Sequence, residues 1–316
     1  MKKPYITHLA LSGGAMKGIC YMGVFRYLYI EKLVNNLKFI HGTSIGSFFA
    51  IALALKIPIE YLEEEVKKII KIINENDDMA ITQKKIHNII LSNGIFDLRF
   101  MMSPIINFLE KEYDIKDITF QELAKKTGVN IYIQSMNFNT GVSRTFSTEN
   151  SPDISVIEAS LASMSIPFLV NPTKIEGDYY IDGEFAYSTK IDMFKDAHAD
   201  NILHILLCEC REFELEELEK DIELNFMKYS TRICHILLKR IFYMYKATTH
   251  ECCTEDYVLK ISDFHCKNAI KFNIKNANEI RMETSDEDVE NFILRGFIDI
   301  TNYMNKRYKD NTIDIM

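Results

Sequence analysis

The chain of 316 residues has no apolar run long enough to cross a membrane. Its longest, Ile45 to Leu55, is far shorter than the ~20 residues that a bilayer-spanning helix needs. The chain also lacks an excess of basic residues, because 37 lysines and arginines stand against 45 acidic residues and give a net charge of -8. Such a chain has no general electrostatic footprint for nucleic acid, so no nucleic-acid partner is expected.

The N-terminus lacks the pattern of a secretory signal. The apolar stretch after Met1-Lys2-Lys3-Pro4 is short, contains His8 and ends in two glycines, which is typical of a strand. The seven cysteines are odd in number and irregularly spaced, so they do not indicate a disulfide framework. We therefore expect an intracellular, cytoplasmic protein, with peripheral membrane association left open.

Glycine is scarce, with 12 in the chain, so the two places where it clusters carry weight. The first is Ser12-Gly13-Gly14-Ala15-Met16-Lys17-Gly18, and the second is the G-x-S-x-G sequence Gly42-Thr43-Ser44-Ile45-Gly46. Each follows a short apolar run and opens an apolar helical pattern. Both loops would therefore meet at the carboxyl edge of one parallel sheet, one with a nucleophile and the other with an anion site. That is the equipment of a serine acyl hydrolase.

The hydrophobic pattern predicts alternating strands and helices. Strands are expected at 5–11, 37–41, 129–138, 142–146 and 201–207, and helices at 16–34, 47–55, 120–127, 153–165 and 286–307. Residues 59–127 are predicted to be mostly helical, with Thr119 and Glu122 as a capping box. Asn139-Thr140-Gly141 predicts a hairpin turn, and Ser285 caps the last helix. The strand–loop–helix–strand–elbow–helix order at the start implies parallel pairing and an α/β fold.

The composition changes after Cys210. Acidic residues crowd positions 209–223 and are absent from Leu224 to His250, where basic residues alternate with apolar ones. The pattern predicts a basic amphipathic helix over 226–246. An ordinary helix packed on the core is the simpler interpretation, and an interfacial helix on anionic lipid is the alternative.

Ser44 stands at the sharp turn from strand to helix. A serine hydroxyl becomes a good nucleophile when a base takes its proton, and this turn aims it into a cleft beside the positive end of a helix. A plain surface turn is the alternative. The N–H groups of Gly13, Gly14 and Ala15 would stabilise the oxyanion, with positive charge added by Lys17. A nucleotide-binding loop is disfavoured, because the pattern lacks the Gly-Lys-Ser/Thr ending of a P-loop.

The base is harder to find from local pattern. None of the eight histidines sits in a motif, and His41 is interpreted as a strand residue. Asp182-Gly183 follows an aromatic, β-prone run at a turn, where a carboxylate projects into a cleft. By local signal alone it is one Asp-Gly turn among others. A Ser–Asp–His triad stays open as an alternative, with candidate bases His198, His204, His250 and His265.

Taken in order, the glycine loop 13–18, the elbow 42–46 and Asp182-Gly183 resemble the patatin-like phospholipase family. Asn139-Thr140-Gly141 and the stretch from Ala159 to Pro167 are also similar to its pattern. The resemblance extends from about residue 5 to 208. It implies a three-layer α/β sandwich with a mostly parallel central sheet flanked by helices. Residues 1–210, or somewhat more, would form the catalytic domain, and residues 211–316 a mainly helical part packed on it.

By this resemblance Ser44 is the nucleophile, and Asp182 is the base that activates first the serine and then water. The oxyanion donors are the N–H groups of Gly13, Gly14 and Ala15, together with that of Ile45. The supporting residues are Lys17, Gly18, Gly42, Gly46 and Gly183. The implied protein is a lipid acyl hydrolase of phospholipase A type, acting on phospholipid without cofactor or metal. A catalytically impaired lipid- or protein-binding module of the same fold is the alternative, and the oligomeric state is left open.

Three positions depart from the family's pattern. Glu184 stands where glycine or alanine usually follows Asp-Gly, and it could crowd or acidify the site. Tyr187-Ser188-Thr189 replaces a usual Asn-x-Pro, and Ala15 replaces a usual glycine but keeps the N–H donor. None of these changes removes a catalytic atom.

One set of histidines and cysteines is considered as a metal-binding site. Its members are His250, Cys252, Cys253, His265 and Cys266. Their adjacent cysteines lack the paired C-x-x-C spacing of a zinc site, so we expect buried or idle thiols.

Overall fold

The computed structural model describes residues 4–75, 81–82, 93–115, 117–186, 189, 191–194, 196–208, 258–262, 271–276, 279–283 and 285–309. Within these residues a sheet of eight strands has the order β11-β10-β1-β2-β5-β9-β8, and β6 pairs with β5 outside this path. Its strands are β1 (His8–Leu11), β2 (Phe39–Thr43), β5 (Asn130–Asn137), β6 (Ser143–Ser147), β8 (Thr173–Ile175), β9 (Asp178–Asp182), β10 (Ile202–Cys208) and β11 (Val258–Ser262). Neighbours from β11 to β5 are parallel, whereas β6 and β9 run antiparallel to β5, and β8 antiparallel to β9.

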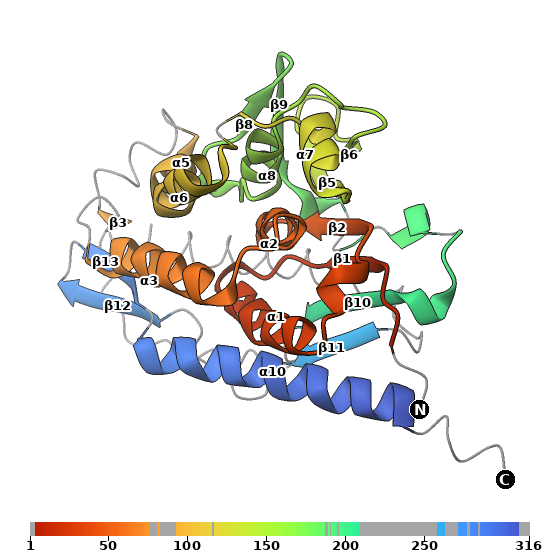
Figure 1. Cartoon of the computed structure of the whole chain (residues 1–316). Helices are drawn as coiled ribbons and strands as arrows, with labels where there is room; N and C mark the ends of the chain where they lie inside the picture. The colour runs from red at the N-terminus through yellow and green to blue at the C-terminus, as the bar shows by residue number, and fades with distance from the viewer. Residues whose placement is uncertain are drawn as a thin grey trace, which may run out of the picture.

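Helices flank this sheet, as Figure 1 shows. They are α1 (Cys20–Ile30), α2 (Ile45–Ala54), α3 (Ile59–Glu75), α5 (Leu98–Met101), α6 (Ser103–Tyr113), α7 (Phe120–Thr127), α8 (Val156–Ser163) and α10 (Asp286–Lys309), with short 3-10 helices at η1 (Ala15–Ile19), η2 (Leu33–Asn36), η4 (Gly183–Phe185), η5 (Ile191–Phe194) and η6 (Ala199–Asn201). Helix α2 packs on β2 and β5, α8 packs on β5, β8 and β9, and α10 runs along α1. The predicted α/β class, a mostly parallel sheet flanked by helices, is confirmed. No helix in the described part of the chain is long and apolar enough to span a bilayer.

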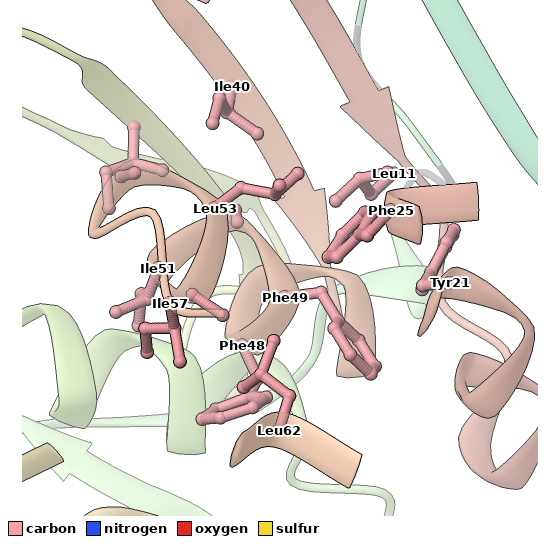
Figure 2. Close-up of a cluster of buried hydrophobic side chains, with 14 of the residues drawn as sticks. Leu11, Tyr21, Phe25, Ile40, Phe48, Phe49, Ile51, Leu53, Ile57 and Leu62 are labelled. Carbon is pink, nitrogen blue, oxygen red and sulfur yellow. The ribbon is translucent and has the colours of Figure 1, made fainter. Parts of the chain in front are cut away.

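Helix α2 lies at the centre of the core because its sequence is apolar on every side. All of its residues from Gly46 to Ala54 are buried. The ring of Phe49 packs edge-on against Phe25 of α1, with 5.5 Å between ring centroids. Figure 2 shows these rings in one cluster with Leu62 of α3 and Ile40 of β2. Burying a side chain of this size stabilises a fold by ~2–3 kcal/mol, so the helix that follows the elbow is firmly anchored.

The predicted chain order at the start is confirmed, with one correction. β1 and β2 pair in parallel with Leu11 opposite Gly42, so the two glycine loops leave the sheet at the same edge. The helix predicted to reach residue 34 ends at Ile30, because Lys32 adopts a left-handed φ of 58°. Leu33 and Val34 are buried in η2, so the helical spacing of apolar residues continues past the end of α1. The spacing alone therefore did not reveal where the helix ends.

The described residues beyond 210 contain strands as well as the predicted helix. β11 extends the main sheet, and β12 (Lys271–Asn276) pairs with β13 (Glu279–Glu283), which also pairs with β3 (Ile81–Thr82). Most of residues 211–316 lie outside the described residues, so the expected mainly helical character of this part stays a prediction. The strand β12 agrees with the apolar–polar alternation of residues 271–276. Helix α10 begins as predicted, and Ser285 Oγ accepts the N–H of Asp288 at 3.1 Å.

The remaining predictions for the C-terminal part are not tested. The basic segment 226–246 and the cysteine- and histidine-containing set at 250–266 lie outside the described residues. The division of the chain at residue 210 stays a prediction. A further pair of strands, β4 (Gly94–Phe96) and β7 (Phe168–Val170), lies apart from the main sheet.

Candidate active site

Strand β5 brings the two candidate catalytic residues together. One of its edges pairs with β6 along the middle of the strand, so β2 and β9 both use the other edge. β2 pairs there as far as Gln134, and β9 pairs from Ser135 onward in the opposite direction. The carboxyl ends of β2 and β9 therefore meet at neighbouring residues of β5. Ser44 follows the end of one strand, and Asp182 is the last residue of the other.

The side chains of Ser44 and Asp182 are directly hydrogen-bonded. Ser44 Oγ donates to Asp182 Oδ2 over 2.6 Å. The second carboxylate oxygen, Oδ1, accepts the backbone N–H of Glu184 at 2.9 Å, which fixes the carboxylate from the other side. Both residues are buried, at 4% and 1% exposure. This geometry lies within the reach that a nucleophile and its base require.

The elbow at Ser44 is a strained turn held by close backbone packing. Ser44 has φ 50° and ψ -129°, a conformation that L-residues rarely adopt and that concentrates at functional sites. A Cβ on Gly42 would lie 2.5 Å from the carbonyl oxygen of Gly46, and one on Gly46 would lie 2.6 Å from that of Leu11. Glycine is therefore required at both positions for space.

The first glycine loop lies against the elbow. A Cβ on Gly13 would lie 2.9 Å from the Cβ of Ser44, and one on Gly18 would lie 2.7 Å from the side chain of Ile45. Ala15 adopts φ 48°, in the left-handed region of backbone conformation that glycine adopts more readily than alanine. The alanine at this position therefore keeps the shape of the loop at a strain of about 1 kcal/mol.

The remaining predicted supporting residues also lie at close backbone contacts or in the loop. A Cβ on Gly183 would lie 2.1 Å from the carbonyl oxygen of Gln134, which explains the glycine after Asp182. A Cβ on Gly14 would lie 2.7 Å from the side chain of Leu207. Lys17 is half-buried, and its N–H donates to the carbonyl of Gly14 at 3.0 Å, closing the turn.

Glu184 contacts both halves of the site and is fully buried. Its backbone N–H holds Asp182, as described above. Its side chain reaches the glycine loop, where Oε1 accepts the backbone N–H of Gly13 at 2.5 Å. A carboxylate from the aspartate turn thus occupies a donor of the glycine loop.

Burial sets the proton affinity of Asp182. It raises the pKa of this carboxyl from 3.8 to about 7, against the opposing hydrogen bonds from Ser44 and from the N–H of Glu184. An aspartate with a pKa near neutrality is a stronger base than an ordinary one and is still largely ionised just above pH 7.

The histidines considered for a triad are placed elsewhere or not described. His204 is buried in β10, burial lowers its pKa to about 4, and its Nε2 lies 2.5 Å from Thr189 Oγ1. His198 is exposed beside Asp200, and His41 is a buried strand residue, as predicted. The positions 250 and 265 lie outside the described residues. The group that accepts the hydrogen bond from the Ser44 hydroxyl is the carboxylate of Asp182.

Ser163 is a site residue that the sequence analysis gave no role. It lies on α8, where its hydroxyl accepts the N–H of Ser44 at 2.8 Å and donates to the carbonyl of Gln134. It thereby ties the elbow to β5. The only signal for it was its position in the stretch similar to the family's pattern, since a buried serine in a helix forms no motif.

Replacing Ser163 by alanine is expected to lower kcat about tenfold with little change in KM. The change leaves the buried N–H of Ser44 without its acceptor, which costs ~1–3 kcal/mol and loosens the elbow. Steady-state hydrolysis of a soluble short-chain ester and urea unfolding would measure the two effects. Ser160→Ala is the matched control, because Ser160 is a buried serine of the same helix that bonds Ser47 and not Ser44. Ser47 keeps its own hydrogen bond to the carbonyl of Ser44 in that variant. A Ser163→Ala enzyme with the wild-type kcat would contradict the positioning role.

Comparison with known proteins gives the family of the chain. The chain matches the family described as patatin-like phospholipase over residues 9–195. It is 29% identical over 192 residues to an uncharacterized protein of Acanthamoeba polyphaga mimivirus, covering 60% of this chain and 62% of that protein. It is 28% identical over 199 residues to the probable lipid hydrolase 463L of Invertebrate iridescent virus 6, covering 61% and 64%. The chain thus spans somewhat less than two thirds of each relative's length.

Two solved structures share the fold. VipD from Legionella pneumophila matches with a TM-score of 0.57 at 15% identity, over 96% of this chain and 67% of that one. ExoU, in its complex with SpcU from Pseudomonas aeruginosa, matches with a TM-score of 0.50 at 14% identity, over 98% and 53%. At such low identity the likeness concerns the fold alone.

Proposed function

The chain belongs to the patatin-like phospholipase family, and we propose that it is a lipid acyl hydrolase of phospholipase A type. It would cleave fatty-acyl esters of phospholipids with Ser44 as nucleophile and Asp182 as base. The observation that carries the proposal is the 2.6 Å hydrogen bond from the strained Ser44 to the buried Asp182, beside a loop of backbone donors. The relative named as a probable lipid hydrolase supports the substrate class.

Acyl transfer to the enzyme is the first half of the proposed reaction. Asp182 Oδ2 takes the proton of Ser44 Oγ as this oxygen bonds to the ester carbonyl carbon. The negative charge moves to the carbonyl oxygen, where the N–H groups of Gly13, Gly14 and Ala15 would donate to it. The ester C–O bond then breaks. The leaving lysolipid alcohol takes the proton back from Asp182, and the acyl group stays on Ser44.

Hydrolysis of the acyl-enzyme is the second half. Water enters where the alcohol left, and Asp182 accepts one of its protons as the water oxygen bonds to the acyl carbon. When this second intermediate collapses, Ser44 Oγ leaves and regains its proton from Asp182. The fatty acid is released and the starting state is restored without a cofactor.

A peripheral contact with the lipid surface is the second part of the proposal. Phe138, Val142 and Tyr179 are exposed by 62%, 62% and 41%, and we call these three the hairpin surface. The N–H of Phe138 donates to the carbonyl of Tyr179 at 2.8 Å, so the two lie together. Phe138 comes about 10 Å along β5 beyond Ser135, which pairs with the catalytic aspartate. Lys174 Nζ, 5.4 Å from the ring of Tyr179, adds a cation that suits anionic headgroups.

Replacing Phe138 and Val142 together by glutamate is expected to weaken binding to vesicles of phosphatidylcholine and phosphatidylserine about tenfold or more. The reason is that apolar side chains at the lipid surface are exchanged for charges. Vesicle co-sedimentation measures the effect, and hydrolysis of a soluble short-chain ester should stay within about twofold. Leu294→Glu is the matched control, since this exposed leucine lies on α10, at the opposite end of the molecule in Figure 1. An equal loss of vesicle binding in Leu294→Glu, or unchanged vesicle binding in the double variant, would refute the role of the hairpin surface in lipid binding.

Fatty-acid release from mixed phospholipid vesicles tests the hydrolase itself. Release by the wild type but not by Ser44→Ala supports the proposal, and equal release by both overturns it.

One observation favours the second candidate, a catalytically impaired lipid-binding module of the same fold. It is the contact of the Glu184 carboxylate with the N–H of Gly13. Vesicle binding without release, in the wild type and in Glu184→Ala alike, would favour that module.

A further inference from the structure

A donor of the glycine loop is already occupied by a carboxylate of the protein. Gly13 presents its N–H beside the nucleophile, and Oε1 of Glu184 accepts it at 2.5 Å. We propose that Glu184 is an autoinhibitory residue: its carboxylate fills the oxyanion position, and turnover requires it to leave. The inference rests on the proposed function, because it takes Gly13 as an oxyanion donor.

The space at the site does not admit the carboxylate and the substrate together. The point where a Cβ on Gly13 would lie is 2.5 Å from Glu184 Oε1 and 2.9 Å from the Cβ of Ser44. The carboxylate and the nucleophile therefore flank the same small volume. A reacting carbonyl oxygen has to come within about 3 Å of its donor, which is where Oε1 now sits. Two oxygens cannot accept the same N–H at that distance.

Charge adds to the steric conflict. The glycine loop serves catalysis by stabilising negative charge that develops on the carbonyl oxygen. A carboxylate beside Gly13 receives that stabilisation in the ground state and repels a second negative charge. Glu184 is fully buried, so water screens this repulsion poorly. The resting site is thus stabilised in a form that resembles the transition state but holds no substrate.

The side chain can leave without disturbing the dyad. Asp182 Oδ1 is held by the backbone N–H of Glu184, not by its carboxylate. The turn itself is fixed by Gly183 against the carbonyl of Gln134. Rotation of the Glu184 side chain, or its removal by mutation, therefore frees the Gly13 donor and keeps the base in place.

The kinetic test compares wild type, Glu184→Gln and Glu184→Ala on a soluble short-chain p-nitrophenyl ester. One oxyanion donor is typically worth 10²–10³ in kcat, so we expect Glu184→Ala to raise kcat/KM by about 10- to 100-fold. Glu184→Gln removes the charge but keeps most of the volume, so its rate should fall between the two. Glu65→Ala, which deletes another buried glutamate, should leave the rate unchanged. A wild-type rate equal to that of Glu184→Ala would overturn the proposal. A loss in Glu184→Ala with retention in Glu184→Gln would also overturn it, because the Glu184 side chain would then assist turnover and not block it.

The contact can be observed without any activity. Ser12-Gly13 is the only Ser-Gly peptide bond in the chain, so labelling serine carbonyls with ¹³C and glycine nitrogens with ¹⁵N selects one amide signal. A short, charge-assisted hydrogen bond should place the Gly13 amide proton far downfield in the wild type, and Glu184→Ala should move it upfield by about 1 ppm. An unmoved signal would show that the contact is absent and would overturn the proposal.

The two measurements separate the possible failures. If the signal moves but no variant hydrolyses any ester, the proposed function fails, and the inhibitory role fails with it. If the wild type hydrolyses the ester as fast as Glu184→Ala, the hydrolase stands and only the inhibitory role is lost. A moved signal with faster turnover in Glu184→Ala supports both.

Discussion

Replacing Ser44 by alanine is expected to reduce ester hydrolysis by about 10⁴-fold or more. The nucleophile of a serine hydrolase acts as a unit with its base, so deleting it removes the covalent pathway and leaves only binding and oxyanion stabilisation. Fatty-acid release from phospholipid vesicles and hydrolysis of a soluble short-chain ester both measure the loss. Because Glu184 occupies the Gly13 donor, the comparison should also be made in a Glu184→Ala background, where the larger basal rate widens the measurable range.

The fold of the Ser44→Ala variant has to be intact for this result to count. Ser44 Oγ makes one hydrogen bond, to a buried carboxylate, and losing it is expected to cost ~1.5–3 kcal/mol of stability. Circular dichroism and urea unfolding check that loss. Ser165→Ala is the matched control, since Ser165 is a fully buried serine whose hydroxyl bonds Leu161 and Thr173. Its backbone carbonyl, which accepts the N–H of Asp182, is kept in this variant. Activity above about one per cent in Ser44→Ala would remove this serine from the mechanism.

The elbow and the glycine loop could be located from the sequence because their geometry constrains residue type. Where a Cβ on Gly42 or Gly46 would lie within 2.6 Å of backbone atoms, glycine is obligatory. In a chain with few glycines such positions stand out. The strands and helices around them were also predictable, since α2 is apolar apart from Gly46 and Ser47 and apolar residues of β1 and β2 precede the two glycine loops.

The partner of Ser44 could not be derived from local pattern. Asp182 reaches it because β2 and β9 share one edge of β5 and meet at adjacent residues. That register joins segments 138 positions apart, and no local periodicity encodes it. The local pattern offered this aspartate as one turn residue among others, and the resemblance of the ordered motifs singled it out. The hydroxyl bridge at Ser163 was missed for the same reason, since its partners are Ser44, which follows β2, and Gln134 of β5, both far from it in the sequence.

Glu184 is a second residue whose contact could not be read from the sequence. The sequence marked its position as a departure from the family's pattern and predicted that its side chain would crowd the site, but it did not identify which residue the side chain contacts. The structure supplies the partner, the N–H of Gly13, 171 positions away. A single side chain at a turn can therefore occupy a backbone donor of the candidate site while Ser44 and Asp182 keep their hydrogen bond.

Replacing Asp182 by asparagine is expected to abolish hydrolysis and to stabilise the fold at neutral and alkaline pH. The amide is nearly isosteric, and it cannot accept the proton of Ser44, so a loss of about 10⁴-fold follows. The same substitution is expected to increase the free energy of unfolding although it removes activity. Burial raises the pKa of Asp182 from 3.8 to about 7, so the folded protein holds this proton more tightly than the unfolded chain. The stabilisation from the proton is complete below about pH 4 and is lost as the pH rises through 7. Asparagine never ionises and avoids that loss, which for this shift is at most about 4 kcal/mol.

Two pH series measure these effects in the wild type and in Asp182→Asn. The kcat/KM of the wild type should rise with pH, with a midpoint of about 7 that reports the free enzyme's base, and then level off. The unfolding free energy of the variant should exceed that of the wild type at pH 8, and the difference should shrink toward pH 4. Asp178→Asn, in the same strand, is the matched control for activity and should leave the midpoint of the kcat/KM series unchanged. A midpoint near pH 4 would mean that water reaches this carboxylate and that burial does not set its pKa. A flat profile would mean that proton removal by Asp182 does not govern the rate, and another base would have to be sought.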